Sequence, residues 1–250
     1  MDLNADLGEG FGAWRLGDDA GLLDVITSAN VACGFHAGDP VTMRRVTGWA
    51  AERGVAVGAQ VGYRDLAGFG RRRIEYAFDE LRDDVVYQMA ALDGFCRVAG
   101  TPLRYVKPHG ALYNTAAVDE RQAAAVVAAI SEYDRGLPVL CPPGSVLAQL
   151  ATGAGLRAVG EGFADRGYLS TGELVPRSAP SALVTDPDEV AARAVRMATQ
   201  GTVVAVDGSV VRCRVASICL HGDTPGAVAL ARLVRSALAE AGVALGPFAS

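Results

Sequence analysis

Three histidines share one setting: each follows a short apolar segment and lies in a glycine-containing loop. They are His36 in CGFHAGDP, His109 in VKPHGALYN and His221 in CLHGDTP. A single loop histidine is usually only solvated or hydrogen-bonded, but here all three occupy equivalent positions. If the segments are parallel strands of one barrel, the imidazoles meet at the end where barrel active sites are built. Because histidine titrates near neutrality, this pattern indicates proton transfer or metal binding.

Lys107 is the only lysine of the chain, because 22 of the 23 basic residues are arginines. Arginine is permanently charged and forked, whereas lysine is a compact charge with an adjustable pKa. Lys107 lies two residues before His109, so the two side chains point the same way if the strand continues. The position therefore predicts a role in the chemistry of the histidine site.

Acidic residues occur at the same strand ends. Asp6 and Glu9 follow the first segment, and Asp6 has no helix to cap. Glu161, Asp165 and Arg166 follow a later one. Arginine binds carboxylates through two parallel hydrogen bonds. Arg166 is therefore expected to hold a substrate carboxylate rather than to form only a surface ion pair with Asp165.

Asp39 and Asp223 also follow histidines, each at the start of an expected helix, where capping is a sufficient explanation. The candidate catalytic residues are Asp6, Glu9, His36, Lys107, His109 and His221. The candidate substrate-binding residues are Asn30, Gln60, Glu161, Asp165, Arg166 and Asp223.

Strand-like segments alternate with amphipathic helical segments along the chain. The expected strands span residues 1–6, 27–33, 55–61, 103–108, 138–141, 157–161 and 216–220. The expected helices span residues 19–25, 40–53, 79–99, 119–132, 144–152, 187–199 and 225–241. Residues 202–215 predict an inserted β-hairpin that turns at Asp207 and Gly208. The alternation predicts a parallel sheet with right-handed crossovers.

The strands alternate polar and apolar residues, which bears on whether the sheet is open or closed. In the first strand Asp2, Asn4 and Asp6 share one face, and apolar residues share the other. An open, doubly wound sheet is covered by helices on both faces, which would make both apolar. A barrel lets the polar faces meet on its axis. We therefore expect a single domain over residues 1–250, an α/β fold with a seven-stranded parallel β/α barrel.

Composition excludes several classes of protein. With 250 residues, half of them hydrophobic, the chain can bury a large core. A net charge of −5 without a basic stripe argues against nucleic-acid binding. There is no apolar run of about 18 residues for a membrane span, and no signal peptide is expected at the start. Five cysteines without a C-x-x-C pair predict free thiols and a cytoplasmic location.

Several catalytic motifs are absent from the sequence. It contains no G-x-x-x-x-G-K-[ST] phosphate-binding loop, no G-x-S-x-G elbow and no H-E-x-x-H pair. A self-contained P-loop ATPase is therefore excluded.

Six sequence motifs together resemble the LamB/YcsF family, the family of the 5-oxoprolinase A subunit. They lie at residues 2–10, 28–39, 106–114, 163–168, 174–177 and 219–223. The resemblance implies a seven-stranded barrel related to glycoside hydrolase and polysaccharide deacetylase barrels. It also implies ATP-dependent opening of 5-oxoproline to L-glutamate, with Mg²⁺ accompanying ATP and with two partner subunits, B and C. For such a reaction we expect Asp6 or His109 to be the general base and Lys107 to contact a phosphate or an oxyanion.

Gln60 departs from the family, which typically has a histidine at this position after the third strand. An amide cannot shuttle protons and is a poor metal ligand, so a metal site would be weakened, whereas an orienting hydrogen bond would survive. The resemblance to deacetylases suggests a divalent metal site. Its residues would be Asp6, His36 and His109.

Two other functions remain open from the sequence. The chain could be a stand-alone metal-dependent amide or carbohydrate hydrolase or deacetylase, or a non-catalytic subunit that binds a small carboxylate. The cluster of titratable residues at the strand ends favours an enzyme over a binding protein.

Overall fold

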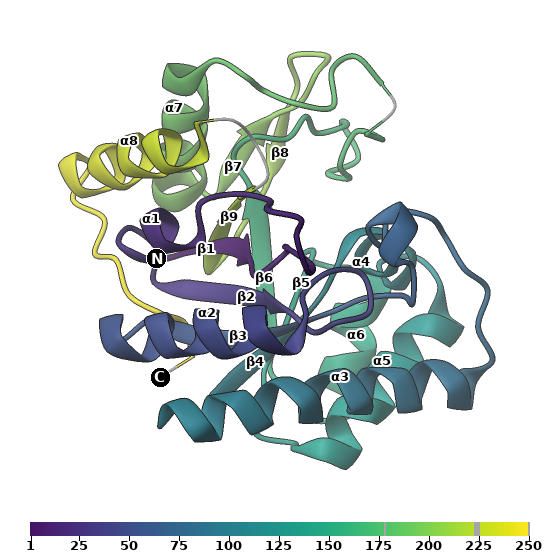
Figure 1. Cartoon of the computed structure of the whole chain (residues 1–250). Helices are drawn as coiled ribbons and strands as arrows, with labels where there is room; N and C mark the ends of the chain where they lie inside the picture. Colours follow the sequence, from purple (N-terminus) through teal and green to yellow (C-terminus); the bar gives the residue numbers. More distant parts are fainter. Residues whose placement is uncertain (178, 223–225, 250) are drawn as a thin grey trace.

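Seven parallel strands close into a barrel in the computed structural model, which describes residues 1–177, 179–222 and 226–249 (Figure 1). In hydrogen-bonded order they are β1 (Asp2–Leu7), β2 (Ser28–Ala32), β3 (Ala56–Val61), β4 (Leu103–Pro108), β5 (Val139–Cys141), β6 (Ala158–Phe163) and β9 (Ser217–Leu220). Strand β9 pairs with both β6 and β1, which closes the barrel. The predicted fold class and all seven predicted strands are confirmed.

Helices surround the barrel. They are α1 (Asp19–Leu23), α2 (Pro40–Arg53), α3 (Phe78–Ala99), α4 (Gly110–Ala116), α5 (Glu120–Tyr133), α6 (Val146–Gly153), α7 (Pro187–Gln200) and α8 (Ala227–Glu240), with a 3-10 turn at Leu66–Gly68. None of those in the described part of the chain is long and apolar enough to cross a membrane. The prediction missed α4, which has seven residues and no side-chain cap at His109.

Helix α2 shows how local sequence sets an element's boundaries. The Asp39 carboxylate caps it by accepting a hydrogen bond from the Thr42 backbone N–H at 2.7 Å, and Pro40 follows as the first helical residue. Gly54 ends it in the left-handed conformation, with φ of 65°. The capping explanation for Asp39 is thus confirmed. The Asp39 carboxylate therefore occupies the N-terminus of α2.

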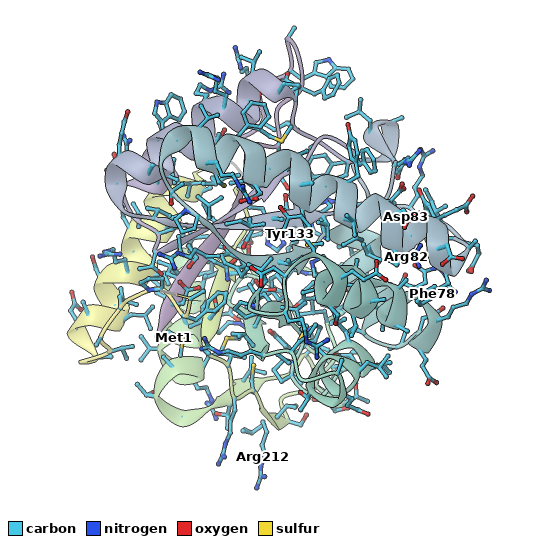
Figure 2. The ribbon with its side chains drawn as sticks, turned by 90° about the horizontal axis from the view of Figure 1, so that it is seen from below. Met1, Phe78, Arg82, Asp83, Tyr133 and Arg212 are labelled. Carbon is cyan, nitrogen blue, oxygen red and sulfur yellow. The ribbon has the colours of Figure 1, made fainter. Side chains whose placement is uncertain are left out.

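The inserted hairpin is also confirmed. Strands β7 (Thr202–Val204) and β8 (Val210–Arg212) pair antiparallel in a sheet of their own. Asp207 accepts a hydrogen bond from the Ser209 backbone N–H at 3.0 Å within the turn. Arg212, at the end of this hairpin, is exposed (Figure 2). Near the start of α3, the partly exposed Arg82 pairs with the exposed Asp83 at 2.8 Å.

The alternation within the strands sorts polar from apolar side chains. In β1, Leu3, Ala5 and Leu7 belong to the main apolar core beneath the helices. The intervening polar residues of β1 are also buried, but they make hydrogen bonds to residues of other strands. The polar faces therefore point to the barrel axis, as predicted.

The end of the barrel at which the strands begin is closed by aromatic packing and by the C-terminal segment. The ring centroids of Tyr105 and Phe248 are 4.8 Å apart. The Gly246 backbone N–H donates to the Met1 carbonyl oxygen at 3.1 Å. The barrel interior is thus closed at this end. An active site can therefore form only at the opposite end, where the strands finish.

Gly58 is required because the Tyr105 ring fills the space beside it. A Cβ added at Gly58 would lie 2.2–2.4 Å from ring atoms of Tyr105. We predict that Gly58→Ala lowers the free energy of unfolding by about 1–3 kcal/mol through overpacking. Gly48→Ala is the control, because a Cβ there meets nothing within 4 Å in a helix. Chemical denaturation should show this control to be unchanged or slightly more stable; equal effects of the two substitutions would contradict the packing argument.

Candidate active site

One pocket at the C-terminal end of the barrel collects six of the residues singled out in the sequence. They are Asp6, Glu9, Lys107, His109, Arg166 and His221. These residues come from the ends of four strands and the loops that follow them, which is where barrel enzymes place their chemistry. Six residues selected from the sequence because they follow predicted strands therefore line the same pocket.

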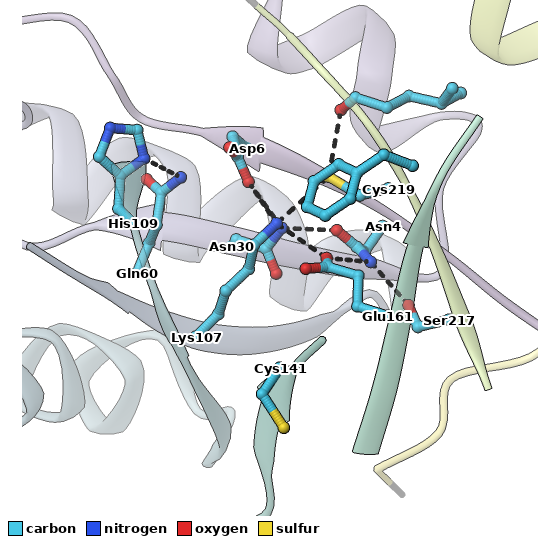
Figure 3. A network of polar contacts seen from close by, with 12 residues as sticks. Asn4, Asp6, Asn30, Gln60, Lys107, His109, Cys141, Glu161, Ser217 and Cys219 are labelled. Carbon is cyan, nitrogen blue, oxygen red and sulfur yellow. Dashed lines mark hydrogen bonds and ion pairs between the residues drawn. The ribbon is translucent and has the colours of Figure 1, made fainter. Parts of the chain in front are cut away.

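Lys107 lines this pocket, and its ammonium belongs to the polar network of the barrel interior (Figure 3). Its ammonium lies 3.0 Å from Asp6 Oδ1 and 2.8 Å from Glu161 Oε1, and only 2% of the residue is exposed. The Cys219 sulfur is 3.2 Å away. Two carboxyl groups therefore share one buried cation.

The pKa values of these groups follow from burial and from their mutual attraction. Burial raises the pKa of Glu161, and its attraction to Lys107 offsets this only in part. Burial acts on Asp6 in the same direction, but Lys107 and the neighbouring histidines outweigh it and leave the pKa of Asp6 below its usual value. The pKa of Lys107 lies well above its usual value because its carboxyl neighbours outweigh burial. Asp6 and Lys107 thus form a persistent ion pair.

A layer of uncharged side chains supports this ion pair from below. Asn30 Nδ2 donates to Asp6 Oδ1 at 2.8 Å and to Asn4 Oδ1 at 2.7 Å, and the Tyr105 hydroxyl donates to Asn30 Oδ1 at 2.7 Å. Asn4 Nδ2 donates to Glu161 Oε1 at 3.0 Å. Asn30 is fully buried, so it orients Asp6 from beneath the pocket. Asn30 does not line the cavity, and its contact with substrate stays a prediction.

His221 is oriented by two partners. Its Nδ1 lies 2.7 Å from Asp165 Oδ2, and its Nε2 lies 2.7 Å from an Nη2 nitrogen of Arg177. A guanidinium only donates hydrogen bonds, so Nε2 must be the acceptor and the proton must sit on Nδ1. Interaction with His221 outweighs burial and lowers the pKa of Asp165. The unprotonated Nε2 of His221 therefore faces the pocket.

His109 and His36 are held differently, by Gln60. Gln60 Nε2 lies 3.0 Å from His109 Nδ1, and Gln60 Oε1 lies 3.2 Å from His36 Nε2. The other nitrogen of His109 is 3.0 Å from the Phe69 carbonyl oxygen. Burial lowers the pKa of His109 to about 4 and that of His36 well below its usual value. Both imidazoles are therefore neutral at physiological pH.

The structure changes the expected metal set. Among the described residues, the group whose ligand atoms lie within 4.8 Å of one another is Glu9, His36 and His109. The sequence paired the two histidines with Asp6, but the Asp6 carboxylate is engaged by Lys107 and Asn30 instead. Glu9, three residues further along the chain, takes its place, and Gln60 Nε2 donates to Glu9 Oε1 at 3.2 Å.

Three guanidinium groups surround the pocket: Arg71, Arg166 and Arg177, here called the arginine cluster. Arg71 and Arg177 are exposed, and Arg166 is 4% exposed. Burial, followed by repulsion from Arg177, lowers the pKa of Arg166 to about 10. A concentration of positive charge in a confined space favours a bound anion.

Arg166 also has a structural task that the sequence did not predict. Its Nε donates to the Ala182 carbonyl oxygen at 2.9 Å and its Nη2 to the Val175 carbonyl oxygen at 2.7 Å. It makes no surface ion pair with Asp165, whose Oδ2 binds His221. Arg166 therefore fixes the loop that carries Arg177 as well as lining the cavity.

The remaining predicted residues lie close to the pocket but behind its surface. Gln60 and His36 are fully buried, Glu161 is 2% exposed and Asp165 is 6% exposed. Asp223 lies outside the described residues.

Sequence reasoning missed several residues of the pocket wall. They are Arg71, Tyr113, Phe163, Leu174 and Arg177. Arg71 lies in the Arg71–Arg73 run, a signal compatible with a phosphate or carboxylate contact, and the other four lie within the motifs at 106–114, 163–168 and 174–177. The sequence motifs thus include pocket-wall residues, but residue type alone does not distinguish a pocket-wall residue from one that only packs in the core.

Fold and site together define the class of protein: a parallel β/α barrel with a charged strand-end pocket. The same fold occurs in a family 4 carbohydrate esterase from Streptomyces lividans, with a TM-score of 0.55 and 12% identity over 100% of this chain and 92% of that one. The chain belongs to the LamB/YcsF family, whose model matches residues 1–250.

Members of this family are much closer in sequence. The chain is 58% identical over 249 residues to the 5-oxoprolinase A subunit of Streptomyces coelicolor, covering 100% of both chains. It is similar to the lactam utilization protein from Thermus thermophilus, with a TM-score of 0.95 and 46% identity over 99% of each chain.

The shared cation gives a stability prediction. Lys107→Met leaves the buried carboxyl groups of Asp6 and Glu161 without their cation, and we expect a loss of about 3–5 kcal/mol in the free energy of unfolding. Adding Asp6→Asn to Lys107→Met should restore part of that loss, because it removes the charge left unpaired. Arg212→Met, at an exposed site, is the control and should change stability by less than about 0.5 kcal/mol. Urea denaturation measures all three; a loss below about 1 kcal/mol for Lys107→Met would contradict a buried ion pair.

Proposed function

We propose that this chain is the A subunit of an ATP-dependent 5-oxoprolinase. It acts with two partner subunits, B and C, to hydrolyse 5-oxo-L-proline to L-glutamate while ATP, accompanied by Mg²⁺, becomes ADP and phosphate. The observation that carries the proposal is the pocket, in which the arginine cluster, a buried ammonium and an oriented histidine face one cavity. The names of the relatives supply the substrate.

The arginine cluster suits the carboxylate of 5-oxoproline. Arg71 and Arg177 stand at the exposed rim, and Arg166 lies deeper. Guanidinium groups bind carboxylates through paired, charge-assisted hydrogen bonds. A carboxylate seated among them would also relieve the repulsion between Arg166 and Arg177. The lactam ring then extends inward, toward Lys107 and His221.

His221 is the best-placed general base. Its Nε2 faces the pocket as an acceptor, and Asp165 holds the proton on Nδ1. Asp165 is thus a positioning residue, in the manner of the aspartate behind a catalytic histidine. When a substrate carboxylate attracts Arg177, Nε2 becomes available to a water molecule. General-base catalysis of this kind contributes about 10²–10⁴-fold to a rate.

The two bases expected from the sequence are less suitable. Asp6 is committed to the ion pair with Lys107, which lowers its pKa and hence its basicity. His109 is held by Gln60 and by the backbone carbonyl oxygen of Phe69, and burial lowers its pKa to about 4. The Nε2 partner of His221 is instead the Arg177 guanidinium, which a substrate carboxylate can attract away. We assign to Asp6 the task of holding the ammonium in place, and to His109 that of forming the pocket wall.

The reaction needs ATP because a lactam is a poor electrophile. Transfer of the γ-phosphoryl group to the amide oxygen forms an O-phosphorylated imidate and releases ADP. Water, deprotonated by His221, adds to the activated carbon, and the C–N bond breaks as the ring nitrogen takes a proton. The resulting acyl phosphate is hydrolysed by a second water to L-glutamate and phosphate. Two waters and one ATP are thus consumed for each ring opened.

Lys107 is suited to stabilise the oxygen at which charge develops. A preorganised donor in a site shielded from water stabilises such an oxyanion more strongly than solvent does. Lys107 Nζ lines the pocket and is held on two sides by carboxyl groups, so it need not reorganise during the reaction. Neutralisation by Asp6 keeps this cation in place inside the barrel.

Activity with the partner subunits tests the proposal directly. We expect release of ADP and glutamate that depends on 5-oxoproline when the chain is mixed with both partners, and none from the chain alone. The control omits each component in turn. No activity in any mixture would contradict the assignment and would favour an unrelated hydrolase.

The assignment of the base gives a kinetic prediction. His221→Asn should lower kcat by about 10²–10⁴-fold with little change in KM, because it removes the base but not the arginine cluster. Asp165→Asn should lower kcat less, since it disturbs only the orientation of His221. Arg212→Met, on the remote hairpin, is the control. Steady-state kinetics of the assembled enzyme measure these effects; a kcat above one tenth of the original in folded His221→Asn would rule out this base.

A further inference from the structure

The Gln60 carboxamide occupies the centre of the group formed by Glu9, His36 and His109. Gln60 Nε2 lies 3.2 Å from Glu9 Oε1 and 3.0 Å from His109 Nδ1, while Gln60 Oε1 lies 3.2 Å from His36 Nε2. Figure 3 shows the Gln60 side chain reaching His109 at the edge of the polar network. Each member of the potential metal-binding group therefore contacts this one amide.

The partners of Gln60 define the orientation of its amide. A carboxylate oxygen accepts hydrogen bonds and does not donate them, so the NH₂ end must face Glu9. The same NH₂ group then donates to His109 Nδ1, which places the proton of His109 on Nε2, where it is donated to the Phe69 carbonyl oxygen at 3.0 Å. The carbonyl end accepts from His36 Nε2. Both imidazoles are thus fixed as Nε2–H tautomers.

The surroundings keep these rings in place. The imidazoles of His36 and His109 stack with centroids 3.9 Å apart and planes inclined by 10°. A Cβ at Gly62 would lie 2.6 Å from His36 Nδ1, and one at Gly70 would lie 2.8 Å from the His36 Cβ. Two glycines therefore allow the backbone to press against the stacked pair, and the rings have little room to turn toward a new ligand.

We propose that Gln60 is a positioning residue that takes the place of a metal ion, so that this chain keeps the Glu9, His36 and His109 group free of divalent cations. A zinc ion needs ligand atoms at about 2.0–2.2 Å around a common centre. Here the uncharged amide fills that centre and makes one hydrogen bond to each of the same three side chains. The pocket wall at His109 is therefore fixed without a metal, whatever the substrate.

Cobalt binding tests this inference without an activity assay. The unmodified chain should show no saturable binding of Co²⁺ at micromolar concentrations, by calorimetry and by visible absorption. Gln60→His replaces the amide with a ligand and should gain one Co²⁺ per chain, bound at least about tenfold tighter than by the unmodified chain. Gln60→His combined with His36→Ala should lose this gain. Gln149→His, at an exposed glutamine, is the matched control and should gain none.

Two outcomes of the cobalt experiment would overturn the proposal. One is micromolar Co²⁺ binding by the unmodified chain that is abolished by His36→Ala. The other is a folded Gln60→His variant, verified by circular dichroism, that gains no site.

Nitrogen NMR of the unmodified chain provides a test that needs no variant. The chain has three histidines, so ¹⁵N labelling of histidine gives three sets of ring signals. At neutral pH the rings of His36 and His109 should both appear as Nε2–H tautomers, and added Zn²⁺ should leave them unchanged. An Nδ1–H tautomer for either ring, or a shift of both sets with Zn²⁺, would contradict the role of Gln60.

Discussion

A single ammonium group, that of Lys107, allows the barrel to have a charged interior. Removing an ionised carboxylate from water costs several kcal/mol, and the cost is recovered only with a close counter-charge and further hydrogen bonds. Lys107 supplies that charge to Asp6 and Glu161 at 3.0 and 2.8 Å. Asn4 and Asn30 supply the hydrogen bonds. Without this cation, the carboxyl groups that β1 and β6 bring together would be buried with no positive charge to offset the cost of removing them from water.

The charged axis in turn determines what the open end of the barrel can do. Lys107 neutralises Asp6, and the three guanidinium groups of the arginine cluster line the same pocket, where they repel one another. The three histidines at this end of the barrel have two different roles. His221 presents an acceptor nitrogen to the cavity, while His36 and His109 are tied to Gln60 as neutral structural groups. A small carboxylate with a reactive carbonyl group is the ligand that this distribution of charge favours.

Much of the fold and part of the site could be predicted from the sequence, because period-2 alternation in β1 and β4 fixes which side chains face the axis. The same alternation placed Lys107 beside His109 and Asp6 in the interior. It could not show that Glu9, rather than Asp6, joins the two histidines, since this depends on how the chain turns after β1. Nor could it find Arg177, which reaches His221 across 44 positions of sequence. Helix α4 escaped prediction because seven residues carry too little periodicity.

The most direct test of a pocket built for a carboxylate-bearing lactam is a comparison of two ligands by calorimetry. 5-Oxo-L-proline and 2-pyrrolidinone share the lactam ring, but only the former has a carboxylate. Since the arginine cluster belongs to this chain, the isolated protein should bind 5-oxoproline and bind 2-pyrrolidinone at least about tenfold more weakly, a difference of about 1.4 kcal/mol. Arg177→Met should reduce that difference. Equal binding of the two lactams, or a preference unaffected by Arg177→Met, would contradict the role of the arginine cluster.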